Sequence, residues 1–151
     1  MKLFQIFLFS IIAMTNVFAQ DLNQRSGSDI EKEVTAVLNE YLASFNSQDI
    51  HAWERTMHFP HYRLASGSMS VQSGPGELPV EAVRRLVGED WDHSTWETMD
   101  FVHLSELKVH VDTKFARHRE DGSIMGMYDS LYILTKENGR WGVKMRSSFA
   151  R

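Results

Sequence analysis

Apolar and polar residues alternate over the last third of the chain in a pattern that predicts three long β-strands. These strands span residues 107–118, 124–136 and 140–149. The first connecting turn contains Asp121-Gly122 and the second contains Asn138-Gly139, and both dipeptides favour the positive φ that a tight reversal between strands needs. Both alternate rows of the middle strand are largely apolar, so we expect this strand to be covered on both faces.

Before the strands, apolar residues recur every three or four positions, which predicts helices. Ser28 followed by Glu31 has the spacing of a capping box. The stripe that follows is about four turns long and consists of Ile30, Val34, Val37, Leu38, Tyr41, Leu42 and Phe45. Asp49 is suited to cap a second, shorter helix, and Pro79 is suited to the first turn of a third.

Pro60 cannot continue the second helix, so the chain is expected to extend there. Tyr62 and Leu64 would share one face of a strand, and residues 66–68 form a turn that brings residues 69–72 back as a short hairpin. The predicted order is helix, helix, short hairpin, helix and a long antiparallel meander. This order predicts an α+β fold in which three N-terminal helices pack on one face of a curved antiparallel sheet, with any pocket between them.

Residues 1–19 have the pattern of a secretory signal peptide. Lys2 is a short positive region, the run from Leu3 to Met14 is nearly all apolar, and cleavage is expected near Ala19-Gln20. An uncleaved membrane anchor is the alternative, although this run is shorter than the roughly 20 residues that span a bilayer. We therefore expect a periplasmic or secreted protein without membrane association after cleavage.

The mature chain is expected to be a polar, disordered leader over residues 20–27 and one domain over residues 28–151. The full sequence has no cysteine, which excludes a disulfide framework, and its formal net charge of −4 with no basic run argues against a nucleic-acid partner. Phosphate-binding loops, Rossmann fingerprints and zinc-ligand spacings are absent from the sequence, so neither cofactor nor metal is predicted.

The chain resembles the nuclear transport factor 2-like superfamily, a cone-shaped, cystatin-like fold that includes ketosteroid isomerase and the SnoaL-like polyketide cyclases. The resemblance runs from Ile30 to Phe149 and rests on the helix end at residues 41–46, the helix around Trp53 and the hairpin at residues 139–143. It implies the fold, but not the function, because this fold hosts isomerases, dehydratases and many non-catalytic binders.

The resemblance also implies two candidate catalytic residues. Tyr41 falls where ketosteroid isomerases carry the tyrosine that donates to the developing oxyanion, and Asp129 falls near the aspartic acid that assists it. The general-base aspartate of those isomerases would fall within residues 64–67, which read Leu-Ala-Ser-Gly, and this departure argues against steroid isomerisation by that route. A core tyrosine and a carboxylate paired with Arg146 or Arg117 are the structural alternatives.

His58 and His61 flank Pro60 where the second helix gives way to a strand. An imidazole can gain or lose a proton near neutral pH, so either histidine is a candidate general base. Two histidines that simply hydrogen-bond to the backbone are the alternative. Their spacing is not the helical His-Glu-x-x-His zinc motif, so no metal site is predicted.

Several further side chains are predicted to line a ligand pocket. They are Trp53, Tyr62, His103, Tyr128 and Arg146. His103 would share a strand row with Phe101, and Arg146 is either an anion clamp inside the cone or a surface charge.

Three functions remain open from the sequence. The first is an exported binding module with a central pocket for a small apolar or aromatic molecule. The second is a lyase or isomerase of the cyclase or dehydratase kind, in which a histidine moves a proton and Tyr41 with Asp129 polarises a carbonyl. The third is a non-catalytic homodimerisation domain whose exposed sheet face, including Val102 and Leu104, forms the interface.

Overall fold

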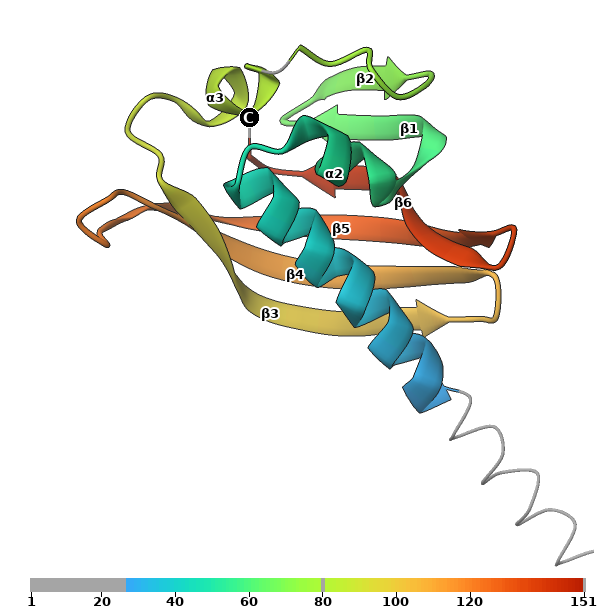
Figure 1. The fold of residues 1–151 in the computed structure, drawn as a ribbon. Coiled ribbons are helices and arrows are strands. Elements are labelled where there is room, and N and C mark those ends of the chain that lie inside the picture. Colours follow the sequence, from blue (N-terminus) through green and yellow to red (C-terminus); the bar gives the residue numbers. More distant parts are fainter. Residues whose placement is uncertain (1–26, 80, 151) are drawn as a thin grey trace, which may run out of the picture.

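The computed structural model describes residues 27–79 and 81–150, which form a curved six-stranded sheet with helices on its concave face (Figure 1). A long N-terminal helix covers residues 27–46 of the described chain. The remaining elements are α2 (Ile50–Arg55), β1 (Met57–Ala65), β2 (Ser68–Gln72), α3 (Ala82–Val87), β3 (His93–Leu104), β4 (Lys108–His118), β5 (Ile124–Glu137) and β6 (Arg140–Ser148).

The strand order across the sheet is β2-β1-β6-β5-β4-β3. Neighbouring strands are antiparallel except for β1 and β6, which run parallel. The sheet does not close, so β2 and β3 are its edges, and the long helix crosses the sheet from one end to the other (Figure 1). The α+β fold predicted from the sequence is therefore confirmed.

The turns follow from their residues. Asn138 and Gly139 have φ values of 53° and 79°, as predicted for an Asn-Gly reversal. At the other turn only Gly122 has positive φ (81°), and its N–H donates to the carbonyl of Arg119 over 2.9 Å. The short hairpin of β1 and β2 also forms, with Ser66 and Gly67 at positive φ.

One end of the concave face is a dense apolar core. Val34 and Leu38 of the long helix are completely buried, as are Val109, Leu134 and Val143 of β4, β5 and β6. All of them belong to one hydrophobic cluster. The apolar residues of this helix form one stripe of period 3.6, which packs on β4, β5 and β6. Burial of this stripe therefore sets the direction in which the helix runs over the sheet.

Three details of the helical half differ from the sequence prediction. Gly27 and Ser28 are already helical, so Gly27 is not part of a leader and Ser28 is not a cap, since a capping residue lies outside the helical turn. Pro79 is not helical, and α3 begins only at Ala82. Asp49, in contrast, caps α2 as predicted, because its carboxylate accepts from the N–H of Ala52 over 2.9 Å.

The predicted signal peptide, residues 1–19, lies outside the described residues. Over residues 27–79 and 81–150, no helix is long and apolar enough to cross a membrane.

Candidate functional site

A groove of about 370 Å³ opens at the rim of the concave face, between α2, the β1–β2 hairpin and the segment that leads into α3. Its volume lies at the lower end of the range for small-ligand pockets. It is lined by both apolar and polar side chains, among them Trp53, His61, Arg63, Val71, Leu78 and Leu86.

Behind this groove, aromatic rings fill most of the interior. Tyr41 lies edge-on to Trp53 and to Tyr132, with ring centroids 5.4 and 5.5 Å apart. The space that remains between the long helix and β3, β4, β5 and β6 is about 20 Å³, which is room for about one water molecule. The hollow that we expected at the centre of the cone therefore lies at its rim.

His61 lies on the groove wall in one defined protonation state. Its Nδ1 is 3.1 Å from the carbonyl oxygen of Val143, and because a carbonyl only accepts, Nδ1 carries the hydrogen and Nε2 is left as an acceptor. Burial, opposed in part by this hydrogen bond, lowers the pKa of His61 to about 4. The imidazole is therefore neutral at neutral pH.

Arg63 and Arg146 face the same interior from adjacent strands. They are Cα partners in the parallel pairing of β1 with β6. Arg63 lines the groove, while Arg146 lines the small cavity behind it and is only 6% exposed. Burial and the charge of Arg146 both lower the pKa of Arg63, as expected when two guanidinium groups share one poorly solvated space.

Arg146 is held between aromatic rings. Its guanidinium carbon lies 5.2 Å from the ring centroid of Phe115 and 5.5 Å from that of Tyr132, and Nη2 donates to Ser148 Oγ over 3.0 Å. The Nε of Arg146 and the Nε of Arg63 are buried and have no hydrogen-bond partner within the described residues. Each arginine thus has a buried donor that no described acceptor satisfies.

Arg117, on β4, adds a third guanidinium to this interior. Its guanidinium carbon lies 5.0 Å above the ring of Tyr128, and burial together with the charges of Arg146 and Arg63 lowers the pKa of Arg117. This end of the concave face therefore concentrates positive charge.

Two carboxylates lie near the groove, but each is engaged elsewhere. Glu54 is buried and accepts from Gln72 Nε2 over 2.6 Å and from the N–H of Gly76, which ties α2 to the loop after β2. Glu77, at the rim, accepts from the N–H of Ser73 over 2.8 Å. Within the described residues, neither carboxylate forms an ion pair with an arginine of the concave face.

His58 does not share the site of His61. Its Nδ1 is 3.0 Å from Thr135 Oγ1, and its ring packs against Gly142, where an added Cβ would lie 2.8 Å from the ring. Burial is the main cause that lowers the pKa of His58. The pairing of β1 with β6 changes register between Met57 and Tyr62, the stretch that contains both His58 and His61.

Three other predicted site residues also lie away from the groove, for reasons of strand geometry. Asp129 is one position out of step with the residues of β5 that face inward, so its side chain points to the outer face. There its carboxylate is exposed and pairs with Lys114 over 3.3 Å. Tyr62 follows the inward-facing His61 and is 37% exposed on the outer face. A register shift after Phe101 turns His103 outward.

Of the predicted residues, the structure brings Tyr41, Trp53, His61 and Arg146 to one interior, with Tyr128 beside Arg117 at its far end. The proposed carbonyl-polarising pair is not brought together, because Asp129 is on the other face of the sheet. Sequence reasoning missed Arg63. The signal was available, since a residue two positions after His61 in a strand shares its face.

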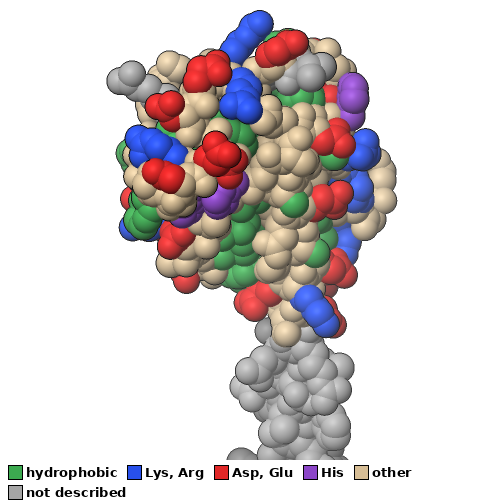
Figure 2. Space-filling model, turned by 60° about the vertical axis from the view of Figure 1, so that its left-hand side comes forward, with side chains coloured by type: hydrophobic (Ala, Val, Ile, Leu, Met, Phe, Trp, Pro, Cys, Tyr) green, Lys and Arg blue, Asp and Glu red, His purple; other side chains and the backbone are tan. Residues whose placement is uncertain are grey.

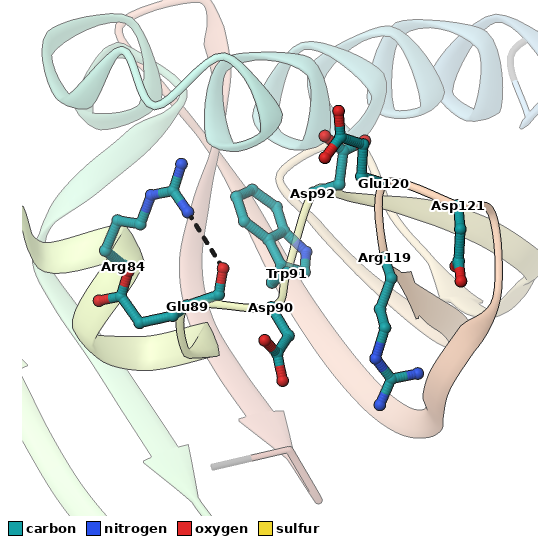
Figure 3. Close-up of a pocket in the computed structure, with 8 residues that line it drawn as sticks. All are labelled: Arg84, Glu89, Asp90, Trp91, Asp92, Arg119, Glu120 and Asp121. Atoms are coloured by element: carbon teal, nitrogen blue, oxygen red, sulfur yellow. Dashed lines mark hydrogen bonds between the residues drawn. The ribbon is translucent and has the colours of Figure 1, made fainter.

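A second hollow, of about 570 Å³, lies between the segment before β3 and the β4–β5 turn (Figure 3). Its acidic residues are Glu89, Asp90, Asp92, Glu120 and Asp121. Their carboxylates do not converge, and Asp90 points away from Asp92 and Glu120 in Figure 3. Over the described chain, no group of three or more potential ligands is arranged to hold a metal ion.

Acidic and basic side chains are interspersed over the face shown in Figure 2. The buried arginines therefore contrast with a protein whose formal net charge is −4.

Comparison with solved structures identifies the fold. An NTF-2 like protein of unknown function from Shewanella oneidensis matches with a TM-score of 0.62 and 14% identity, over 79% of this chain and 98% of that one. A ketosteroid isomerase-like protein from Erwinia carotovora matches with a TM-score of 0.59 and 23% identity, over 78% of this chain and 93% of that one.

The association domain of the Caenorhabditis elegans kinase CaMKII matches with a TM-score of 0.63 and 12% identity, over 82% of this chain and 98% of that one. No curated protein matches the sequence. A family model described as NTF2-like protein (DUF6841) matches residues 31–146, most of the described chain. The protein is therefore a member of this NTF2-like family.

Proposed function

We propose that the protein is a binding module that holds a small molecule with an apolar or aromatic body in the groove at the rim of the cone. The observation that carries this proposal is the groove itself. It reaches buried Trp53 from solvent and is flanked by Leu78 and Leu86, so a ligand there would lose apolar surface to the protein.

The position of Asp129 favours binding over the lyase or isomerase mechanism. That mechanism needs Tyr41 and Asp129 on one substrate oxygen. Tyr41 is buried among aromatic rings, and Asp129 is exposed on the opposite face beside Lys114. His61 remains available as a hydrogen-bond acceptor for a bound ligand.

The binding proposal is tested with N-phenyl-1-naphthylamine, a neutral aromatic dye that fluoresces in apolar surroundings. Ser70 lines the groove from β2, and a Ser70→Trp substitution would fill it. The wild type is expected to enhance the dye's fluorescence and Ser70→Trp to abolish the enhancement. Ser68→Trp, on the same strand but outside the groove, is the matched control, and an equal loss in both variants, or no enhancement in the wild type, would contradict the proposal.

We also propose that two copies associate through the outer face of β2 and β1 and the residue that follows β6. Apolar side chains are exposed there in adjacent rows, since Tyr62 pairs with Val71 and Leu64 with Met69 across the hairpin. Val71, Met69 and Phe149 are 51%, 59% and 78% exposed. Isolated exposed apolar residues are ordinary, but exposed apolar side chains that pair across two neighbouring strands are typical of an interface.

Val102 and Leu104 are exposed on β3 as well, at the opposite edge of the sheet, and offer a control. Light scattering after size exclusion is expected to give the dimer mass for the wild type and for Val102→Glu, and the monomer mass for Met69→Glu. A monomeric wild type would rule out this proposal and leave the groove unaffected. One structure that shares the fold is the association domain of CaMKII, which supports an association role for this fold.

We further propose that the domain acts in the periplasm or outside the cell, because residues 1–19 have the pattern of a signal peptide. N-terminal sequencing of the protein secreted from its own host is expected to begin at Gln20. A sequence that begins at Met1 would contradict export by cleavage.

A further inference from the structure

We propose that the ligand of the groove is a small amphiphilic oxyanion, whose charged group is held between Arg63 and Arg146 and whose apolar body occupies the groove. This inference rests on the binding function proposed above and specifies its ligand. The chemistry at issue is that of a carboxylate or similar oxyanion on an aromatic or aliphatic body.

Arg146 is buried without a negative charge to compensate it. Transfer of a guanidinium to a poorly solvated interior is costly unless an opposite charge accompanies it. Phe115, Tyr132 and Ser148 offer two ring faces and one neutral hydrogen-bond acceptor, and none of the three carries a charge. Within the described residues no carboxylate pairs with Arg146. An oxyanion would supply the missing charge and accept from the unsatisfied Nε.

The relative position of the two arginines also favours an anion between them. Partners on adjacent strands lie about 5 Å apart along the hydrogen-bonding direction. Arg63 and Arg146 are such partners, and both face the interior. Two guanidinium forks at this spacing can share one oxyanion, and charge-assisted bonds from arginine are the strongest that a carboxylate finds in proteins.

Polarity also changes along the groove. Arg85 and Glu77, which are exposed at its mouth, have opposite charges, whereas Arg63 on the wall and Arg146 behind it are both positive. The apolar side chains of Leu78 and Leu86 lie on the wall between α3 and the segment that leads into it. A ligand would therefore enter with its oxyanion first and leave its apolar body against these side chains.

His61 refines the expected ligand without adding charge. It is neutral, and its Nε2 can accept a hydrogen bond. A ligand that also carries a hydroxyl or amide donor close to its oxyanion would satisfy this acceptor together with Arg63. An ammonium group, in contrast, would be repelled by the two guanidinium groups.

The test compares 2-naphthoate with 2-naphthamide, which have the same aromatic body and nearly the same shape and differ in charge. Isothermal titration calorimetry of the wild type is expected to show naphthoate binding at least about tenfold more tightly, as charge-assisted hydrogen bonds predict. Equal affinities would overturn the anion inference and leave the binding function standing. If neither compound binds, the binding function itself fails.

Variants locate the charge selectivity. Arg63→Met and Arg146→Met are each expected to weaken naphthoate about tenfold and to change naphthamide less than about twofold. Arg119→Met removes an exposed arginine at the β4–β5 turn and is the matched control, with no expected effect on either compound. Circular dichroism shows whether each variant is folded. If a variant is unfolded, the comparison of naphthoate with naphthamide in the wild type still tests whether the groove prefers an anion. Naphthoate binding that survives both groove variants would overturn the assignment.

Discussion

The two ends of the concave face are built from the same sheet and covered by the same helix, yet they differ in chemistry. At the end near the β5–β6 turn, Val34 and Leu38 pack on Val109, Leu134 and Val143, all completely buried. At the other end, the corresponding inward rows carry the arginines of β1, β4 and β6, together with aromatic rings. The first end is apolar throughout, and the second is cationic.

The difference indicates what each end is for. Apolar burial stabilises the fold by roughly 25 cal/mol per Å² and needs no further partner. Buried guanidinium groups cost stability unless an anion compensates them. A domain that already has one complete core gains nothing in stability from arginines in the second, so we infer that the cationic end serves binding. Three changes test this contrast, in order of expected size.

Leu134→Ala tests the apolar end and should have the largest effect. Removing a completely buried leucine leaves a cavity, and the expected loss in the free energy of unfolding is about 2–5 kcal/mol. Urea denaturation followed by circular dichroism measures it. Leu131→Ala, a half-buried leucine on the opposite face of β5, is the control and should cost less than about 1.5 kcal/mol. Equal losses would mean that the core does not lie where we place it.

The pH dependence of stability tests the border between the two ends, where His61 is buried. Its pKa is about 4 in the folded protein against 6.5 when exposed, so between these values the unfolded chain binds a proton that the folded chain does not. Stability should therefore fall as the pH is lowered from 7 to 5, by about 2 kcal/mol from this residue. Denaturation at a series of pH values measures the slope.

His61→Asn is the matched variant for that slope. Its side-chain amide can still donate to the carbonyl of Val143 but does not titrate. The difference in slope between the two proteins isolates His61 from His58, whose pKa is also lowered. Identical slopes would show that His61 is already solvated in the folded state.

Arg146→Met tests the cationic end and should have the smallest effect, of opposite sign. Methionine fills a similar volume without charge, so the free energy of unfolding is expected to rise by about 1 kcal/mol while naphthoate binding weakens about tenfold. The measurement is urea denaturation beside calorimetry of the same samples. A loss of more than about 1 kcal/mol would assign Arg146 to the fold instead of to a ligand.

Much of the architecture could be predicted because it depends on local patterns. The helical stripe ending at Phe45, the cap at Asp49 and the Asn138-Gly139 reversal each follow from a few neighbouring residues. The same patterns gave the α+β fold and the resemblance to the family. The predicted start of α3 was wrong because a proline is favoured in the first turn of a helix but does not by itself start one.

The candidate site was harder to predict because it depends on which face of each strand a residue occupies. A shift of one position moves a side chain to the other face, which explains Asp129 and Tyr62, and a register shift has the same effect at His103. The pairing of Arg63 with Arg146 joins two strands that lie far apart in the sequence and run parallel, so no local pattern shows it.

The most direct test of the cationic site is the NMR response of the arginine Nε–H groups to the two naphthyl compounds. The Nε–H signals of Arg63 and Arg146, assigned by loss in the corresponding methionine variants, are expected to shift on titration with 2-naphthoate and to remain in place with 2-naphthamide, while that of Arg119 stays unchanged with both. Shifts of equal size with both compounds, or shifts with neither, would contradict the claim that this end of the sheet holds an anion.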